Sequence, residues 1–142
     1  MWYAENNIWL NFATNVLKKT YKYFYIIELN YTTFDNPNKH MVLKLSTSED
    51  FDKFTFKYGY ITKEIEFDFI FIYWPKVIKK YGGIEVTSDI KNRRYINTPT
   101  VIEYYKKHNF NIKNDTSSWF YAFDIPSGCV WNPKSIKTFT QI

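Results

Sequence analysis

The sequence contains few of the residues from which metal sites and disulfides are built. Its 142 residues include one cysteine, Cys129, and two histidines, His40 and His108. One cysteine cannot form a disulfide within the chain, and none of the three residues stands at a short ligand spacing such as CxxC or HxxxH. Pairing of Cys129 with a histidine as a nucleophile is a weaker interpretation than a buried structural cysteine. We therefore expect no metal site, and a reducing compartment, the cytoplasm, is the expected location.

The sequence also lacks long apolar runs, a signal peptide and phosphate-binding glycine motifs. No run of 18 apolar residues is present and the mean hydropathy is −0.43, which argues against a membrane span. The N-terminal residues show neither the charged start nor the apolar core of a secretory signal. With four glycines, the chain contains neither GxxxxGKS/T nor GxGxxG, so the usual cradle for the phosphates of ATP is missing.

Aromatic and positively charged residues are present in excess. Phe, Trp and Tyr make up 22% of the chain, hydrophobic residues make up 45%, and the formal net charge is +5. This composition is too apolar for a disordered chain, and the length suits one folded domain over residues 1–142. The abundance of Asn, Lys, Ile, Tyr and Phe, whose codons are rich in A and T, indicates an A/T-rich genome.

The spacing of apolar residues predicts four short helices. The first is expected to begin at Ile8 behind an Asn7 cap, and the second is expected over residues 48–58. Two more, each opened by a proline in the first turn, are expected over residues 74–81 and 98–108.

Strands are predicted where apolar and polar residues alternate with a period of two. Residues 21–31 show this alternation most fully, so we expect them to form a central strand. In residues 65–71 the odd-numbered positions form the apolar face of a strand-like pattern, and a loop packed on the core is the alternative interpretation. The other strands are expected at residues 41–45, 84–86, 119–125 and 128–131. The predicted fold is a compact α+β domain with a mixed, mostly antiparallel central β-structure and three to four short helices.

One cluster of cations is not explained by the ends of helices. The lysine pairs elsewhere stand near predicted helix C-termini, where the helix dipole favours them. Residues 91–94 instead lie in a polar connection and include Arg93 and Arg94, the only arginines in the sequence. Arginine binds phosphate through two parallel hydrogen bonds, and aromatic residues can stack on bases. Nucleic-acid contact through Arg93 and Arg94 is therefore an alternative function.

Two further polar features have both a structural and a functional interpretation. The Ser-Thr-Ser sequence of residues 46–48 follows an apolar strand, but Ser46 and Glu49 have the spacing of a capping box for the next helix. Glu85 stands at the start of a strand, just after a glycine turn. There it can orient a ribose hydroxyl or act as a base, although a solvated strand glutamate is the commoner case.

The segment SGCVWNP, residues 127–133, resembles the ending of a group of small uncharacterised phage and bacterial proteins with a YDGI and SGCIWN pattern. This resemblance implies a phage- or virus-encoded protein. It extends over most of the chain, at Trp2, Tyr3, Trp9, residues 25–29, Phe54, Tyr58, Trp74, Val77, Tyr81, Gly83 and Ile84.

The chain has a more distant resemblance to the ADP-ribosyltransferase fold. Many members of that superfamily pair a GYDGI strand with a later ExVxFxPxxIK strand, and the counterparts here are residues 81–84 and 130–137. Ser127 stands where the catalytic glutamate of the family would be, and Trp2 and Tyr3 stand in place of its early His or Arg. The family's glutamate stabilises an oxocarbenium-like state through its negative charge, which serine does not have. The Ser-Thr-Ser of residues 46–48 is similar to a motif of one branch.

The resemblance implies an ADP-ribosyltransferase-like protein that handles NAD or a related nucleotide, as an enzyme or as a descendant of one. The alternative is a non-catalytic protein that binds a host factor or nucleic acid, such as an anti-defence inhibitor. Neither function involves a membrane. The residues expected at the nucleotide site are Glu85 and Ser127 as catalytic residues, and Tyr3, Trp9, Tyr25 and Tyr81 as contacts to the nucleotide.

Overall fold

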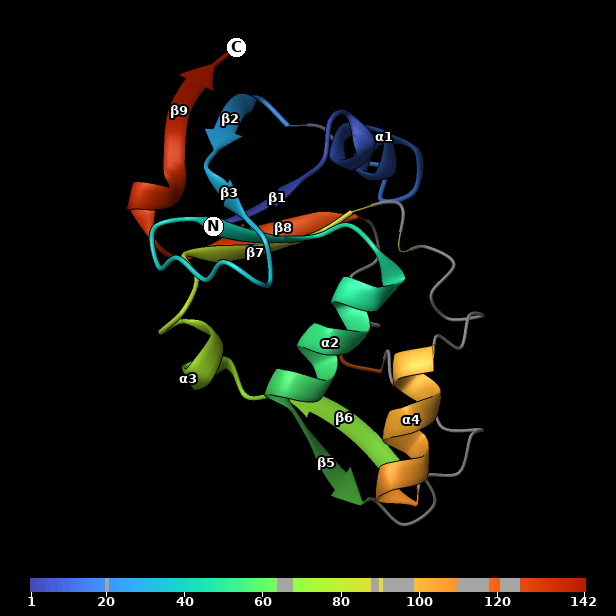
Figure 1. The fold of residues 1–142 in the computed structure, drawn as a ribbon. Coiled ribbons are helices and arrows are strands. Elements are labelled where there is room, and N and C mark those ends of the chain that lie inside the picture. The colour runs from blue at the N-terminus through green and yellow to red at the C-terminus, as the bar shows by residue number, and fades with distance from the viewer. Residues whose placement is uncertain (20, 64–67, 88–89, 91–98, 110–117, 121–125) are drawn as a thin grey trace.

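A five-stranded mixed sheet forms the centre of the fold (Figure 1). The computed structural model describes residues 1–19, 21–63, 68–87, 90, 99–109, 118–120 and 126–142. The order of the strands is β1 (Trp2–Ala4), β8 (Ser127–Val130), β7 (Gly83–Val86), β4 (Val42–Leu45) and β3 (Tyr31–Thr32). In this order, β1, β8 and β7 pair antiparallel, and β7, β4 and β3 pair parallel.

Helices cover one face of this sheet and enclose the hydrophobic core. In Figure 1, α2 (Ser48–Tyr58) and α3 (Trp74–Val77) lie below the sheet. The apolar residues of α2 recur three and four positions apart, which places them on the side that faces the strands. The largest fully buried side chains of the core are those of Tyr81, Phe51, Phe54, Leu43, Leu45, Ile84 and Ile90.

The ends of α2 follow from the local sequence. The Thr47 hydroxyl accepts a hydrogen bond from the Asp50 backbone N–H at 3.1 Å, so Thr47 is the N-cap. The capping-box interpretation of Ser46 is therefore wrong by one position. Gly59 ends the helix and begins β5 (Gly59–Lys63), which the sequence pattern did not predict.

The β5 strand pairs antiparallel with β6 (Asp68–Ile72) and forms a hairpin below α2 in Figure 1. In β6, Ile70 and Ile72 are buried, whereas Phe71 is 44% exposed. The prediction that the odd-numbered residues form the apolar face was wrong, because both faces of this strand carry large apolar side chains.

The last helix, α4 (Pro99–His108), lies beside α2 and is close to its predicted range. The rings of Phe56 on α2 and Tyr104 on α4 stack with their centroids 3.9 Å apart. Trp119 belongs to the short 3₁₀ helix η2 (Ser118–Phe120) and not to a strand. Residues 121–125 of the strand predicted at residues 119–125 lie outside the described residues, as do residues 91–94.

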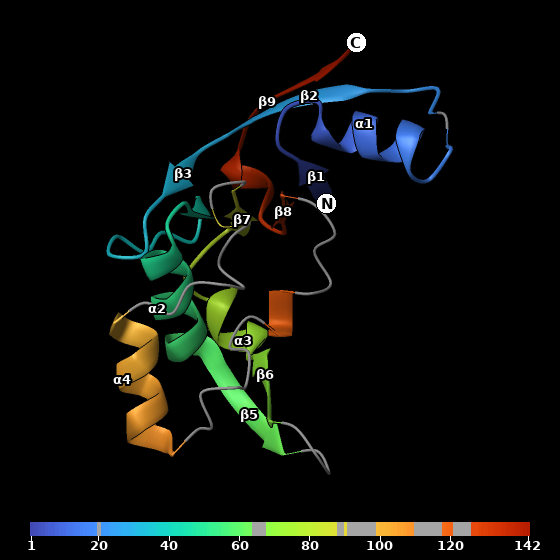
Figure 2. The same cartoon turned by 90° about the vertical axis from the view of Figure 1, so that its right-hand side faces the viewer.

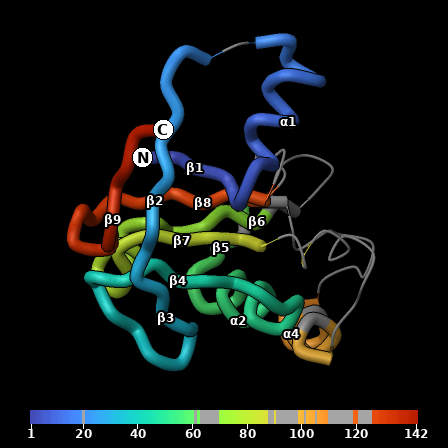
Figure 3. Tube along the Cα trace, turned by 90° about the horizontal axis from the view of Figure 1, so that it is seen from above, coloured from blue at the N-terminus to red at the C-terminus, as the bar shows by residue number. Residues whose placement is uncertain are grey.

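A two-stranded ribbon spans the other face of the sheet. It consists of β2 (Tyr25–Leu29) and β9 (Ile136–Gln141), which pair antiparallel. Figures 2 and 3 show this β2–β9 ribbon crossing over the sheet, with α1 (Ile8–Asn15) beside β1. The expectation of a central strand at residues 21–31 was wrong, because β2 pairs with the unpredicted strand β9 instead of joining the sheet.

The α1 helix begins at Ile8 as expected, but the side chain of Asn7 makes no capping hydrogen bond. Four of the six strand pairings among the described residues are antiparallel. The structure thus confirms a compact α+β fold with a mixed sheet and four short helices. Within the described ranges, no helix combines the length and the apolar character needed to cross a membrane.

Candidate functional site

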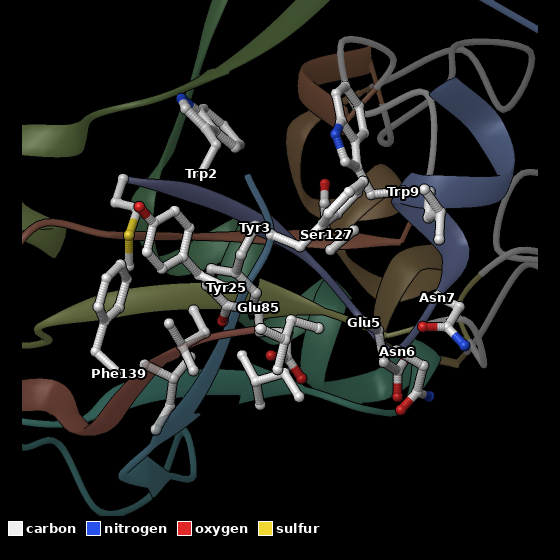
Figure 4. A pocket seen from close by; sticks show the side chains of 18 of the residues that line it. Trp2, Tyr3, Glu5, Asn6, Asn7, Trp9, Tyr25, Glu85, Ser127 and Phe139 are labelled. Carbon is white, nitrogen blue, oxygen red and sulfur yellow. The ribbon is translucent and has the colours of Figure 1, made fainter. Parts of the chain in front are cut away.

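A cleft of about 1300 Å³ lies between the sheet and the β2–β9 ribbon. Its floor is the sheet face opposite the core, and residues of β1 and the first turn of α1 form one side (Figure 4). The ribbon contributes Tyr25 and Phe139, which lie at the left in Figure 4. The cleft therefore joins segments from both ends of the sequence with strands from its middle.

The strand register sets a row of residues across the floor. Tyr3 on β1 pairs with Gly128, Gly128 pairs with Glu85, and Glu85 pairs with Lys44. Directly paired residues of neighbouring strands point to the same face of a sheet. Because the flanking residues Ile84 and Val86 point into the core, this row points into the cleft.

Glu85 is the polar centre of the floor and is only 2% exposed. The Tyr31 hydroxyl donates a hydrogen bond to Oε2 of Glu85 at 2.6 Å, and Nζ of Lys44 lies 3.3 Å from Oε1. The same ammonium group lies 4.8 Å from the centroid of the Tyr31 ring, within reach of a cation–π interaction. A buried carboxylate needs such partners because it has lost the solvation of water. Tyr31 and Lys44 thus hold Glu85 in place.

Gly128 provides the space that Tyr3 occupies. A Cβ atom at position 128 would overlap the hydroxyl end of the Tyr3 ring and would lie 2.7 Å from the Ile84 carbonyl oxygen. Because glycine has no Cβ, the Tyr3 ring can extend across β8 from β1 toward Glu85.

The environment of the floor raises the pKa of both of its tyrosines. Burial is the largest cause at Tyr3, followed by the negative charge of Glu85. Burial is also the largest cause of the raised pKa of Tyr31, followed by its hydrogen bond to Glu85, and the charge of Glu5 adds a smaller effect. Both phenols therefore stay protonated at neutral pH and can donate hydrogen bonds.

Two polar atoms of the floor are buried without a hydrogen-bond partner among the described residues. They are the Tyr3 hydroxyl and Oε2 of Glu5. Glu85 and Tyr31 lie close enough to Tyr3 to raise its pKa, but neither completes a hydrogen bond with its hydroxyl. In folded proteins more than about 90% of buried polar groups are paired, so these two atoms stand out.

Aromatic side chains surround this floor. Tyr25 stacks on Phe139 across the ribbon with ring centroids 4.8 Å apart. On the other side, Trp9 of α1 contacts Phe12 with its ring centroid 5.9 Å away. Exposed ring faces of this kind bind planar groups by stacking.

The cleft brings together most of the residues predicted for the nucleotide site: Glu85, Ser127, Tyr3, Trp9 and Tyr25. Glu85 and Ser127 are not direct neighbours, however. The register pairs Ser127 with Val86, one position further along β7, and no hydrogen bond joins Ser127 to Glu85 among the described residues.

Tyr81 does not line the cleft, so its predicted role as a nucleotide contact was wrong. Its side chain is fully buried in the core, and its hydroxyl donates to the Phe34 carbonyl oxygen at 3.2 Å. Tyr81 follows the turn after α3, and its backbone N–H donates to the Val77 carbonyl oxygen at 3.0 Å. Arg93 and Arg94 lie outside the described residues.

Sequence reasoning missed Tyr31, Lys44 and Glu5 as residues of the floor. Lys44 carries a detectable signal, because it is a charged residue inside the apolar segment of residues 42–45. Tyr31 was placed in a predicted strand but not in the site. Glu5 gives no local signal, since its position depends on how β1 pairs with β8.

The site therefore combines a paired buried carboxylate, a carboxylate with one unpaired oxygen, two protonated phenols and aromatic walls. In the part of the chain that the structure describes, no group of three or more His, Cys, Asp or Glu side chains is placed to hold a metal ion. No family model matches the chain, and comparisons with curated proteins and with solved structures find no match either.

Proposed function

We propose that this protein binds NAD or a related nucleotide in the cleft, as an ADP-ribosyltransferase-like enzyme or as a descendant of one that has lost the reaction. The observation that carries the proposal is that Glu85 and Ser127 line one cleft together with Tyr3, Trp9 and Tyr25. Its volume of about 1300 Å³ exceeds the roughly 300–1000 Å³ of typical ligand pockets, a size that would admit a nucleotide.

The walls and the floor would recognise different parts of the nucleotide. Trp9 and Tyr25 offer ring faces on which a base can stack, an interaction that contributes about 1–3 kcal/mol per base. An ionised carboxylate can accept roughly four hydrogen bonds. Glu85 uses two of these positions for Tyr31 and Lys44, so others can accept hydrogen bonds from ribose hydroxyls.

The same carboxylate would support cleavage of the bond between the ribose and nicotinamide. When the bond between C1′ and the ring nitrogen breaks, its electron pair leaves with nicotinamide and positive charge develops on the ribose. The fixed negative charge of Glu85 would stabilise this state. An acceptor oxygen then bonds to C1′ and loses its proton.

The Glu85→Gln variant tests this function. We expect wild-type protein to bind NAD in calorimetric titration and to release nicotinamide. The variant should lose turnover and bind NAD roughly tenfold to a hundredfold more weakly, because a hydrogen bond to a charged group contributes about 1.5–3 kcal/mol.

Glu28→Gln is the matched control. Glu28 lies on β2 but does not line the cleft, and its carboxylate is exposed, 4.0 Å from Nζ of Lys137. The control should bind NAD like the wild type. A wild-type protein that neither binds nor cleaves NAD would overturn the proposal.

A non-catalytic interaction protein is the second candidate function. Large apolar side chains around the cleft remain exposed: Trp2 at 67%, Phe139 at 53% and Ile142 at 72%. Exposed apolar surface of this kind is typical of sites that dock a partner. In this second function the protein would be an anti-defence inhibitor of phage or viral origin, and its partner would be a host factor or nucleic acid.

If nucleic acid is the partner, the affinity for an oligonucleotide should fall steeply as the salt concentration rises, and it should also fall in an Arg93→Ala, Arg94→Ala double variant. Oligonucleotide binding that depends neither on salt nor on the two arginines would exclude nucleic acid as the partner.

A further inference from the structure

The α1 helix leaves most of its apolar face uncovered. The structure describes α1 throughout, and only Ala13 of this helix is fully buried. Six large apolar side chains on the helix and on the chain that follows it are exposed, most of all Val16 at 62% and Tyr23 at 56%. We call these six the α1 patch: Trp9, Leu10, Val16, Leu17, Tyr21 and Tyr23. Four of them line the same cleft, and Val16 and Leu17 lie between those four in the chain.

The charge around the α1 patch is of one sign. Residues 6–27 contain no Asp or Glu, whereas Lys18, Lys19 and Lys22 fall within this range and are exposed. The helix ends at Asn15, so all three lysines lie beyond its last turn, where the helix dipole no longer accounts for them. Among the described residues, no carboxylate forms an ion pair with these lysines. The patch therefore combines exposed apolar side chains with available positive charge.

This combination favours an anionic lipid bilayer as the partner. Aliphatic side chains gain little from a nucleic acid, but they can enter the acyl chains beneath lipid headgroups. Tryptophan and tyrosine are enriched at the interface between membrane and water, and lysine binds anionic headgroups. A second copy of the chain fits less well, because a two-fold dimer through the patch would bring the lysines of both copies together.

We propose that the α1 patch docks on the surface of an anionic phospholipid bilayer. Val16 and Leu17 enter the bilayer below the headgroups, and the three lysines contact the headgroups. In Figure 2, α1 and β2 lie on the side of the sheet away from α2, α3 and α4, so a bilayer can contact the patch without displacing the core. The inference goes beyond the proposed function, and it adds a membrane surface as a partner, which the functions expected from the sequence do not include.

Sedimentation with vesicles tests the docking. The full chain is mixed with vesicles of phosphatidylcholine alone or of phosphatidylcholine with one quarter phosphatidylglycerol. We expect binding to the anionic vesicles, and this binding should weaken as the salt concentration rises. A Lys18→Gln, Lys19→Gln, Lys22→Gln variant should bind roughly a hundredfold more weakly, because each lysine near an anionic surface strengthens binding about fivefold.

The matched control removes three lysines from the other side of the sheet. Lys76 on α3 and Lys79 and Lys80 after it are also exposed, and Figure 1 shows α3 below the sheet and α1 above it. A Lys76→Gln, Lys79→Gln, Lys80→Gln variant should bind within about threefold of the wild type, because charges more than about 10 Å from the bilayer are screened. Equal weakening of both triple variants would mean that net charge alone drives binding, and would overturn the inference.

A Val16→Asn, Leu17→Asn variant tests the apolar contact. It should bind anionic vesicles at least about tenfold more weakly, because it removes the side chains that enter the acyl chains. Neither residue lines the cleft and both are exposed, so NAD binding and the Tm should stay close to those of the wild type. Unchanged vesicle binding by this variant would overturn the inference.

The remaining outcomes separate the partners. Wild-type protein that does not bind anionic vesicles would overturn the inference, whether it binds an oligonucleotide, forms a dimer in light scattering or does neither. Vesicle binding by a protein that neither binds nor cleaves NAD would support the inference and overturn the proposed function alone.

Discussion

Tyr3, Tyr31 and Tyr25 have the same side chain and use it in different ways. Tyr3 and Tyr31 are enclosed beside Glu85, and their raised pKa values keep them as protonated donors. Tyr25 lies on the ribbon, where its ring stacks on Phe139 and its other surface faces solvent. A tyrosine is therefore a hydrogen-bond donor in the floor of the cleft and a stacking surface in its wall.

Alkaline titration should detect the two tyrosines of the floor. Their pKa values lie above the ordinary value of 10.0, so the folded state keeps protons that the unfolded chain releases. Their contribution to stability is complete below about pH 10 and is lost as the pH rises further. We expect phenolate absorbance to rise in two phases, with the second phase coinciding with unfolding in circular dichroism.

Three variants test whether Tyr3 and Tyr31 cause the second phase of phenolate absorbance. Tyr3→Phe and Tyr31→Phe should each reduce its amplitude. Glu85→Gln should shift it to lower pH, because it removes a negative charge that raises both pKa values. A second phase that none of these substitutions alters would contradict the enclosed positions of the two phenols.

Residue type alone identified part of the site. Glu85 could be singled out because an acidic residue after a glycine turn is conspicuous at the start of a buried strand. Tyr81 could not be excluded, since a tyrosine suits a core as well as a pocket, and its partner Phe34 is 47 positions away in sequence. The unpaired oxygen of Glu5 could not be predicted, because it results from the three-dimensional arrangement and not from any pattern.

At the scale of single elements, α2 allows a test of which residue caps its N-terminus. Thr47→Ala should lower the free energy of unfolding by about 1 kcal/mol, because the Asp50 N–H loses its acceptor. Ser46→Ala should change it by less than about 0.5 kcal/mol. Urea unfolding of both variants measures the difference. A larger loss for Ser46→Ala would show that Ser46, and not Thr47, caps the helix.

The helix over residues 48–58 could be predicted from sequence, whereas the helix predicted over residues 74–81 ends at Val77, and the strand partners could not be predicted. A helix is determined by neighbours three and four positions apart, so the range of α2 was predicted correctly. Alternation in β2 indicated a strand, but it carries no information about the partner strand, which is β9. In β6 the alternation was misleading, because Phe71 and Ile72 are both large and apolar and the tertiary packing selects which of them is buried.

For the whole molecule, hydrogen exchange should distinguish the sheet from the ribbon. β4 and β7 are buried along almost their whole length, whereas β2 and β9 are mostly exposed. Opening the ribbon breaks few apolar contacts, so its paired amides should exchange at least about tenfold faster than those of β4 and β7. NMR or mass spectrometry can measure this. Saturating NAD should slow exchange in the ribbon, and equal protection of all four strands without ligand would contradict the prediction.

The ribbon pairs Tyr25 with Gln141 and Leu29 with Ile136, so its two strands come from distant parts of the sequence. Closing such a large loop is entropically costly and makes this pairing a late event in folding. During synthesis, β2 can pair only after β9 has left the ribosome, and the ribbon covers Glu85 only after this pairing. A nascent chain therefore exposes its aromatic wall until β9 has been synthesised, and chaperone contact during that interval would be directed to Tyr25 and its neighbours.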